Sequence, residues 1–117
     1  MEIKRDAEVE AAPVQMDGAK DVVKQVLIGP DDGSENIIVR LFTVSPGGYT
    51  PCHTHDFEHL VRIIDGQGVY VDADGQEHTL LPGMNVFVPP NEKHQFANNS
   101  AAPFAFTCTI PNPESTR

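Results

Sequence analysis

The 117-residue sequence is poor in basic residues, with 8 Lys and Arg against 17 Asp and Glu and a formal net charge of −9. Nucleic acid and anionic membranes bind basic surfaces, so neither is an expected partner. No apolar run approaches the roughly 18 residues of a membrane-spanning helix. The opening segment MEIKRDAEVE also lacks the apolar centre of a secretory signal. We therefore expect a cytoplasmic protein.

Cysteine is scarce, and helical periodicity is missing. Two cysteines far apart in the sequence, Cys52 and Cys108, do not make a disulfide framework, and we expect two free thiols. No stretch of about ten residues has apolar positions at 3.6-residue spacing, which argues against an open α+β domain. Instead, 10 prolines and 9 glycines separate short β-branched runs.

These runs predict about eight short strands in a single all-β domain. A sandwich or a closed barrel would accommodate them. Turn signals lie between the runs, among them the SPGG segment at 45–48. Residues 1–20 are polar and read as an extended N-terminal arm, and residues 21–117 as one barrel. The expected strands cover residues 22–29, 37–44, 59–65, 68–74, 76–81, 85–88, 94–99 and 104–110.

Three of the five histidines, His53, His55 and His59, fall within seven positions. In a strand, alternate residues share a face, so these histidines lie on the same side as Val61 and Ile63. This apolar side is the expected interior. Leu60 and Ile64 on the opposite side indicate a subunit contact.

Buried imidazoles need partners. Each histidine could bond a separate carbonyl or carboxylate. Alternatively, they could share one metal ion, for which neutral imidazole is the commonest side-chain ligand. The His-x-His spacing with a third histidine of equal parity favours the metal. His94, which opens a later strand, is the expected fourth ligand, whereas His78 reads as a solvated residue of a surface hairpin.

Two long motifs resemble those of the cupins. The family's first motif has Gly, His-x-His, Glu and Gly, and its second has Gly, Pro, Gly, His and Asn. This chain shows their spacing at Gly47, His53, His55, position 59, Gly66, Gly83, Pro89, position 91, His94 and Asn98. It departs twice. Asn91 replaces a glycine but tolerates the same left-handed backbone. His59 replaces the glutamate, and Glu58 is one residue off, with the wrong parity.

The resemblance implies a double-stranded β-helix, or jelly-roll barrel, with little or no helix. Its metal ligands would be His53, His55, His59 and His94. The pattern is similar to that of small single-domain cupins that bind manganese and form homodimers, in which the N-terminal strand packs on the partner. The expected cofactor is thus one divalent transition metal per chain, manganese first and iron second. Imidazole ligands also suit zinc, nickel and copper.

Four neutral histidines could complete a closed tetrahedral zinc site. The cupin resemblance favours an open site, which would suit dioxygenase-like oxidation of a small organic substrate. On the last two expected strands, an apolar pocket is predicted at Phe96, Phe104, Phe106 and Cys108, with plain core as the alternative for each phenylalanine. Asp56 or Glu58 would orient a ligand histidine from outside.

Two other functions remain open. A cupin can hold a small ligand or a metal without catalysis, as a sensor or a store. A metal-dependent isomerase or lyase would need a general base, for which Tyr49 is the nearest candidate.

Overall fold

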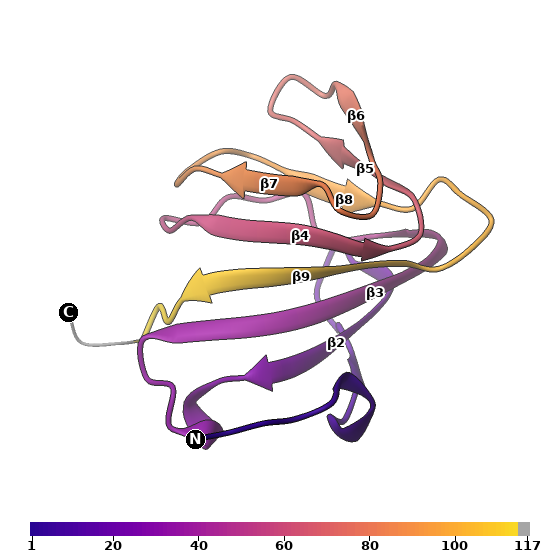
Figure 1. Ribbon diagram of the computed structural model, residues 1–117. Helices are drawn as coiled ribbons and strands as arrows, with labels where there is room; N and C mark the ends of the chain where they lie inside the picture. Colours follow the sequence, from indigo (N-terminus) through magenta and orange to yellow (C-terminus); the bar gives the residue numbers. More distant parts are fainter. Residues whose placement is uncertain (115–117) are drawn as a thin grey trace.

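The protein is built of β-strands, and the structure, a computed structural model, describes residues 1–114 (Figure 1). This part of the chain contains two single turns of 3-10 helix and no α-helix, which confirms the all-β prediction. None of its helical turns is long or apolar enough to cross a membrane. The elements are η1 (Asp6–Glu8), β1 (Ala12–Pro13), β2 (Lys20–Ile28), η2 (Pro30–Asp32), β3 (Ile37–Tyr49), β4 (His59–Asp65), β5 (Gly68–Val71), β6 (Glu77–Leu80), β7 (Asn85–Val88), β8 (Gln95–Ala97) and β9 (Phe104–Pro111).

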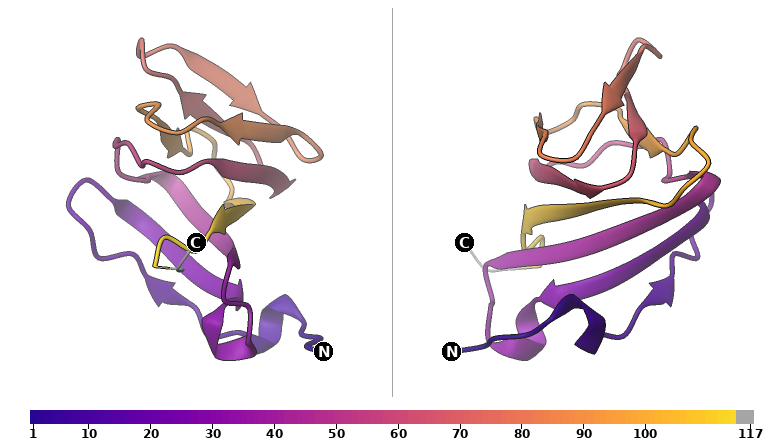
Figure 2. Two further views of the ribbon diagram at one scale, coloured as in Figure 1. Left: turned by 90° about the vertical axis from the view of Figure 1, so that its left-hand side faces the viewer. Right: turned by 45° about the vertical axis from the view of Figure 1, so that its right-hand side comes forward.

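The strands form one strongly curved antiparallel sheet, with the order β6-β5-β8-β3-β9-β4-β7 and with β2 and β1 added beside β3. The long strand β3 lies in the middle of the sheet, since it pairs with β2 and β9 along most of its length and with β8 at Tyr49. Figure 2 shows the sheet curling, with the β5–β6 hairpin and the β2–β3 pair at opposite ends. This is the arrangement expected of a double-stranded β-helix.

Alternation along the strands places the core on the concave side. Every second residue of β9 is buried, from Phe104 at 0% exposure to Ile110 at 5%. In β4, His59 is buried together with Val61 and Ile63, while Leu60 is 56% exposed. The predicted inward side of this strand is therefore confirmed.

The predicted turn at residues 45–48 is wrong, because this segment lies inside β3. Lys20 of β2 pairs with Tyr49 of β3, whereas Val22 already pairs with Val44. The extra residues of β3 are taken up in a bulge, where Gly47 has a φ of 81°. The glycines thus permit an irregularity within the strand and do not reverse the chain.

The N-terminal arm packs against its own barrel. Strand β1, which was not predicted, pairs with β2, and the Val14 amide donates to the Val22 carbonyl (2.9 Å). The Gln25 side chain donates to the carbonyls of Asp6 (2.7 Å) and Val9 (2.9 Å). Residues 1–14 are therefore held at several points along β2.

Candidate metal centre

Backbone hydrogen bonds bring the two histidine segments together. His53 and His94 form an antiparallel bridge in which each amide donates to the other's carbonyl, at 3.2 and 3.1 Å. On one side of this bridge the Thr50 amide donates to the Phe96 carbonyl (2.8 Å), and on the other the Asn91 amide donates to the His55 carbonyl (2.6 Å). The two segments therefore run antiparallel to each other.

Asn91 adopts the left-handed backbone that the sequence predicted, with a φ of 67°. Asparagine is one of the few residues with a side chain that visits this region at low cost. The turn it makes after Pro89 and Pro90 points its amide at the His55 carbonyl. A residue that is not a ligand thus fixes the spacing between the two histidine segments.

His59 comes from β4 and completes a cluster of four rings. A ring nitrogen ligates a metal at about 2.0–2.1 Å, so the centroids of two rings on one ion lie within about 6.5 Å of each other. For five of the six pairs the centroid distances are 4.3 Å for His53–His55, 5.7 Å for His53–His94, 5.1 Å for His55–His59, 6.3 Å for His55–His94 and 5.1 Å for His59–His94.

Burial and mutual repulsion keep three of the imidazoles uncharged. The pKa of His53 and the pKa of His55 both lie below the usual histidine value, first because of burial and then because of the neighbouring rings. The pKa of His59 falls to about 3 for the same reasons. At neutral pH these three rings are neutral and carry lone pairs that a cation can accept.

The donor atoms suit a divalent transition metal. Nε2 of His53 and Nε2 of His55 lie 3.0 Å apart, and two ligands at right angles on one ion are separated by about 3.0 Å. His94 donates Nδ1–H to the Glu92 carbonyl (2.9 Å), which leaves Nε2 as the ring nitrogen that could bind a metal. Nδ1 of His59 is buried and has no hydrogen-bond partner.

The four rings lie close together, but their nitrogens do not all point at one position. Within residues 1–114, no three His, Cys, Asp or Glu side chains already stand in the positions of a metal-ligand set. The fit to a metal therefore rests on the donor atoms and the closeness of the rings.

The outer contacts expected of Asp56 or Glu58 remain a prediction. Asp56 and Glu58 are both exposed, and neither is hydrogen-bonded to a histidine in the described part of the chain. Both residues lie outside the strands, and the negative charge of Asp56 still acts on His55, whose pKa it raises against the larger effects of burial and positive neighbours. The outer contact that the structure shows is the Glu92 carbonyl on His94, and because it is a backbone group no side-chain pattern could have revealed it.

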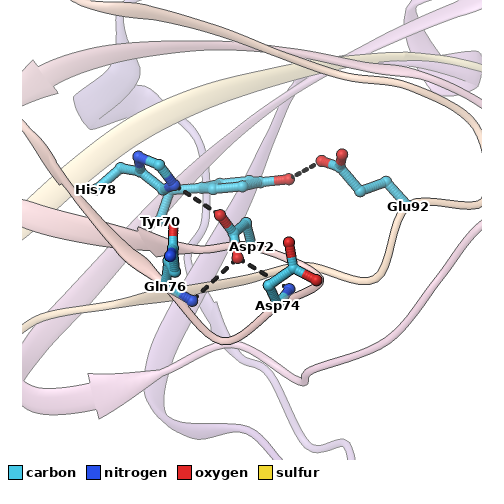
Figure 3. Close-up of polar contacts among 6 residues, drawn as sticks. All are labelled: Tyr70, Asp72, Asp74, Gln76, His78 and Glu92. Atoms are coloured by element: carbon cyan, nitrogen blue, oxygen red, sulfur yellow. Dashed lines mark hydrogen bonds and ion pairs between the residues drawn. The ribbon is translucent and has the colours of Figure 1, made fainter.

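A hydrogen bond from the β5–β6 hairpin to Glu92 supports this contact (Figure 3). The Tyr70 hydroxyl, at the end of a largely buried ring, donates to the carboxylate of Glu92. Burial and that carboxylate hold the pKa of Tyr70 well above its usual value, so the hydroxyl remains a donor. In the same hairpin, Asp72 is ion-paired with the exposed His78 (2.8 Å). His78 thus lies outside the cluster, as predicted.

A pocket of about 140 Å³ opens beside the four histidines. Of the predicted pocket residues, Phe96, Phe106 and Cys108 line it, and Phe104 does not. Phe104 is fully buried against Gly68, where an added Cβ would come within 2.4 Å of its ring. The remaining lining residues are Val14, Met16, Val22, Lys24, Arg40, Phe42, Thr50 and Pro51.

Two other expectations concern groups near the pocket. Tyr49 is 37% exposed and is not part of the lining, so the pocket offers no position for it as a general base. Cys52 is exposed and Cys108 is buried, and both are free thiols as predicted.

Sequence reasoning missed the two basic residues of the lining, Lys24 and Arg40. A signal for Arg40 was present, because it is the only charged residue in the run IIVRLFTV and shares parity with Phe42. A charged side chain on the inward face of an otherwise apolar strand has a structural or a functional partner. No comparable pattern marks Lys24.

Comparison with known proteins agrees with this geometry. The cupin domain family matches residues 40–110. The fold is similar to the polyketide cyclase RemF from Streptomyces resistomycificus, with a TM-score of 0.91 and 31% identity over 96% of this chain and 80% of the cyclase.

Two curated relatives are similar over shorter stretches. Gentisate 1,2 dioxygenase 1 from Aquipseudomonas alcaligenes is 29% identical over 92 residues, which cover 73% of this chain and 26% of the dioxygenase. Auxin-binding protein T85 from Nicotiana tabacum is 31% identical over 75 residues, or 56% of this chain and 40% of that protein. The chain thus spans less than half the length of each of these two relatives. The family match, the curved sheet and the paired histidine motifs lead to one conclusion, that this chain belongs to the cupin family.

Proposed function

We propose that this chain is a metal-dependent cupin enzyme that cyclises a small, oxygen-rich organic substrate by intramolecular condensation. In such a reaction a methylene carbon joins a carbonyl carbon of the same molecule and water is lost. The observation that carries the proposal is the cluster of four histidines at a pocket that no carboxylate of residues 1–114 lines. The similarity to a polyketide cyclase over 96% of the chain supports the class of reaction.

The proposed cofactor is one divalent transition metal held by His53, His55, His59 and His94. Manganese is the first choice and iron the second, from the cupin resemblance, and imidazole ligands also suit zinc, nickel and copper. A bound metal would act as a Lewis acid toward carbonyl and enolate oxygens. Neutral imidazoles leave the ion's double charge uncompensated, which favours such oxygens over neutral groups.

The other residues of the pocket shape the space for the substrate. Phe96 and Phe106 present apolar faces beside the histidines, and Val14 and Met16 of the N-terminal arm line the same space. These side chains would exclude water from a reactive enolate and hold a chain of carbonyl groups folded on itself. Folding of the substrate brings the reacting carbons together and so lowers the entropic barrier.

A second candidate, dioxygenase-like oxidation, is favoured by the similarity to gentisate 1,2 dioxygenase 1 over 73% of the chain. An open site with a redox-active metal would suit it, as predicted from the sequence. Oxygen uptake separates the two reactions, because condensation consumes no dioxygen.

The test begins with metal analysis of the purified protein, followed by incubation of the manganese, iron and zinc forms with linear polyketones and with dihydroxybenzoates. Cyclisation predicts a product lighter by one water, formed at the same rate without oxygen. Oxygen-dependent ring cleavage would replace the cyclase by the dioxygenase. Tight binding with no turnover by any metal form would contradict both and would leave a ligand-binding cupin.

A further inference from the structure

Arg40 of β3 places a positive charge in the histidine pocket. Its guanidinium lies over the Phe42 ring, 5.0 Å from the centroid, and the residue lines the same pocket as all four histidines. The positive charge of Arg40 is among the causes that lower the pKa of His53, His55 and His59. The guanidinium and the rings therefore face a common space.

The donors of this guanidinium are largely unused by the protein. Arg40 Nη2 donates to the sulfur of Cys108 (3.1 Å), which is a weak acceptor. Its Nε is buried and has no hydrogen-bond partner among the residues that the structure describes. The ion pairs in residues 1–114 are Lys4–Asp32 and Asp72–His78, so no carboxylate of that part of the chain neutralises Arg40.

An unpaired guanidinium at this position costs the protein free energy. A partly buried charge without a counter-ion loses hydration and gains little in return. The chain has 17 acidic residues, yet the pocket lining contains Lys24 and Arg40 and no Asp or Glu. A negatively charged ligand would supply the missing partner, and a guanidinium fork matches the two oxygens of a carboxylate.

The apolar part of the lining contains a row of stacked aromatic rings. The Phe106 ring is stacked on Phe42, with centroids 5.5 Å apart and planes at 25°, and on Phe96, at 4.6 Å and 28°. The row of three rings begins at Phe42, which lies under Arg40, and ends at Phe96, which lies beside His94. Phe96 is 5% exposed and Phe106 is 2% exposed, so a ligand between the guanidinium and the histidines would meet only the apolar edge of this row.

We propose that Arg40 determines specificity by binding a carboxylate of the substrate, which makes the substrate an organic acid whose other oxygens face the histidines. The inference rests on the proposed function, since it names the substrate class of that site. Arg40 would position this acid and would not itself take part in bond changes.

The test compares two matched probes, 3,4-dihydroxybenzoate and its uncharged amide, by calorimetry on the zinc-loaded protein without oxygen. The catechol oxygens are the same in both probes, so the difference reports on the carboxylate. The acid should bind about 10–100-fold more tightly than the amide, as a charge-assisted hydrogen bond predicts. Arg40→Gln should abolish this preference, and Arg40→Lys should keep part of it.

Arg62→Gln is the matched control, because it removes the same charge from an exposed residue that is hydrogen-bonded to Asn85 on the outer face of β4. An equal loss in Arg62→Gln would overturn the proposal in favour of general electrostatics. Unchanged preference in a folded, zinc-loaded Arg40→Gln protein would overturn it too, as would wild-type protein that binds neither probe.

The metal-free protein separates this inference from the proposed function. Arg40 does not depend on the metal, so chelator-treated wild-type protein should still prefer the acid, with lower affinity for both probes. If no metal form shows turnover but the Arg40-dependent preference persists, the proposed enzyme activity is wrong and the role of Arg40 in binding a carboxylate is supported. If turnover occurs and the preference is absent, the role of Arg40 is wrong and the proposed enzyme activity is supported.

Discussion

At the scale of single residues, His59 stands out in the cluster because it is buried with an unpaired ring nitrogen. It is 5% exposed, its Nδ1 has no hydrogen-bond partner, and it occupies the position where the cupin pattern has a glutamate. An unpartnered buried nitrogen costs free energy in the metal-free protein. A metal ion that accepts its lone pair after rotation of the ring would remove that cost.

Replacing His59 by alanine removes a proposed ligand and should lower metal affinity. At other metal sites, loss of a residue that only contacts a ligand lowers the affinity about 10–100-fold, so we expect at least this loss here. Elemental analysis after dialysis against limiting metal would measure the change. His78→Ala is the control, since this exposed histidine pairs with Asp72 outside the cluster. Unchanged metal content in His59→Ala would transfer the role to Glu58.

The metal-free protein should lose stability as pH falls below about 6.5. The pKa of His59 is about 3 in the folded state and about 6.5 in an unfolded chain. The unfolded chain therefore binds the proton first, and the stabilisation that His59 gives by remaining neutral is present above pH 6.5 and declines toward pH 3.

Urea unfolding of chelator-treated protein at pH 7.5 and pH 5 would measure this loss, and His59→Gln should reduce the pH dependence. His78→Gln should retain it. Equal pH dependence of the wild type and His59→Gln would show that other groups control acid unfolding.

At the scale of elements, the turn between β7 and β8 sets the distance between the histidine segments. Asn91→Gly should fold normally, whereas Asn91→Ala should lose about 1–2 kcal/mol, the cost of a left-handed backbone for an ordinary side chain. The Ala variant should also bind metal more weakly, because the Asn91 amide holds the His55 carbonyl at 2.6 Å. Urea unfolding and metal titration would measure both effects, and equal stability of the two variants would contradict the argument.

The N-terminal arm depends on one side chain of β2. Gln25→Ala removes two hydrogen bonds to arm carbonyls, so amide exchange in residues 6–16 should speed up while exchange in β3 and β9 stays the same. Gln67→Ala, at an exposed position between β4 and β5, is the control. Unchanged exchange in the arm of Gln25→Ala would mean that β1 and the Lys4–Asp32 pair hold it without Gln25.

At the scale of the whole molecule, the outer face of β4 and β7 exposes large apolar side chains. Leu60 is 56% exposed and its cross-strand neighbour Phe87 is 58% exposed. Cross-strand pairing makes them one apolar patch, which is a common mark of a protein interface. The homodimer expected from the cupin resemblance could use this face as well as the N-terminal arm.

We expect light scattering to give a dimer for the wild type and a monomer for the double variant Leu60→Glu, Phe87→Glu. Two buried carboxylates would face their own copies across a symmetric interface and repel each other. Ile3→Glu, at an exposed position on the arm, tests the other surface. A wild-type monomer would contradict the homodimer, and dissociation by Ile3→Glu alone would place the contact on the arm.

Local chemistry of the sequence determined the strand content, the inward side of β4, the free cysteines and the left-handed Asn91, because each depends on near neighbours along the chain. The inward side of His59 also followed from strand parity, but His53 and His55 lie outside the strands, and the bridge between His53 and His94 joins their segments. What only the tertiary structure decided depends on contacts between distant segments: the bulge at Gly47, the pairing of β1, the burial of Phe104 against Gly68 and the place of Arg40 beside the histidines. Parity tells which side of a strand a residue is on, but only the curvature of the sheet determines which of the inward residues meet at one pocket.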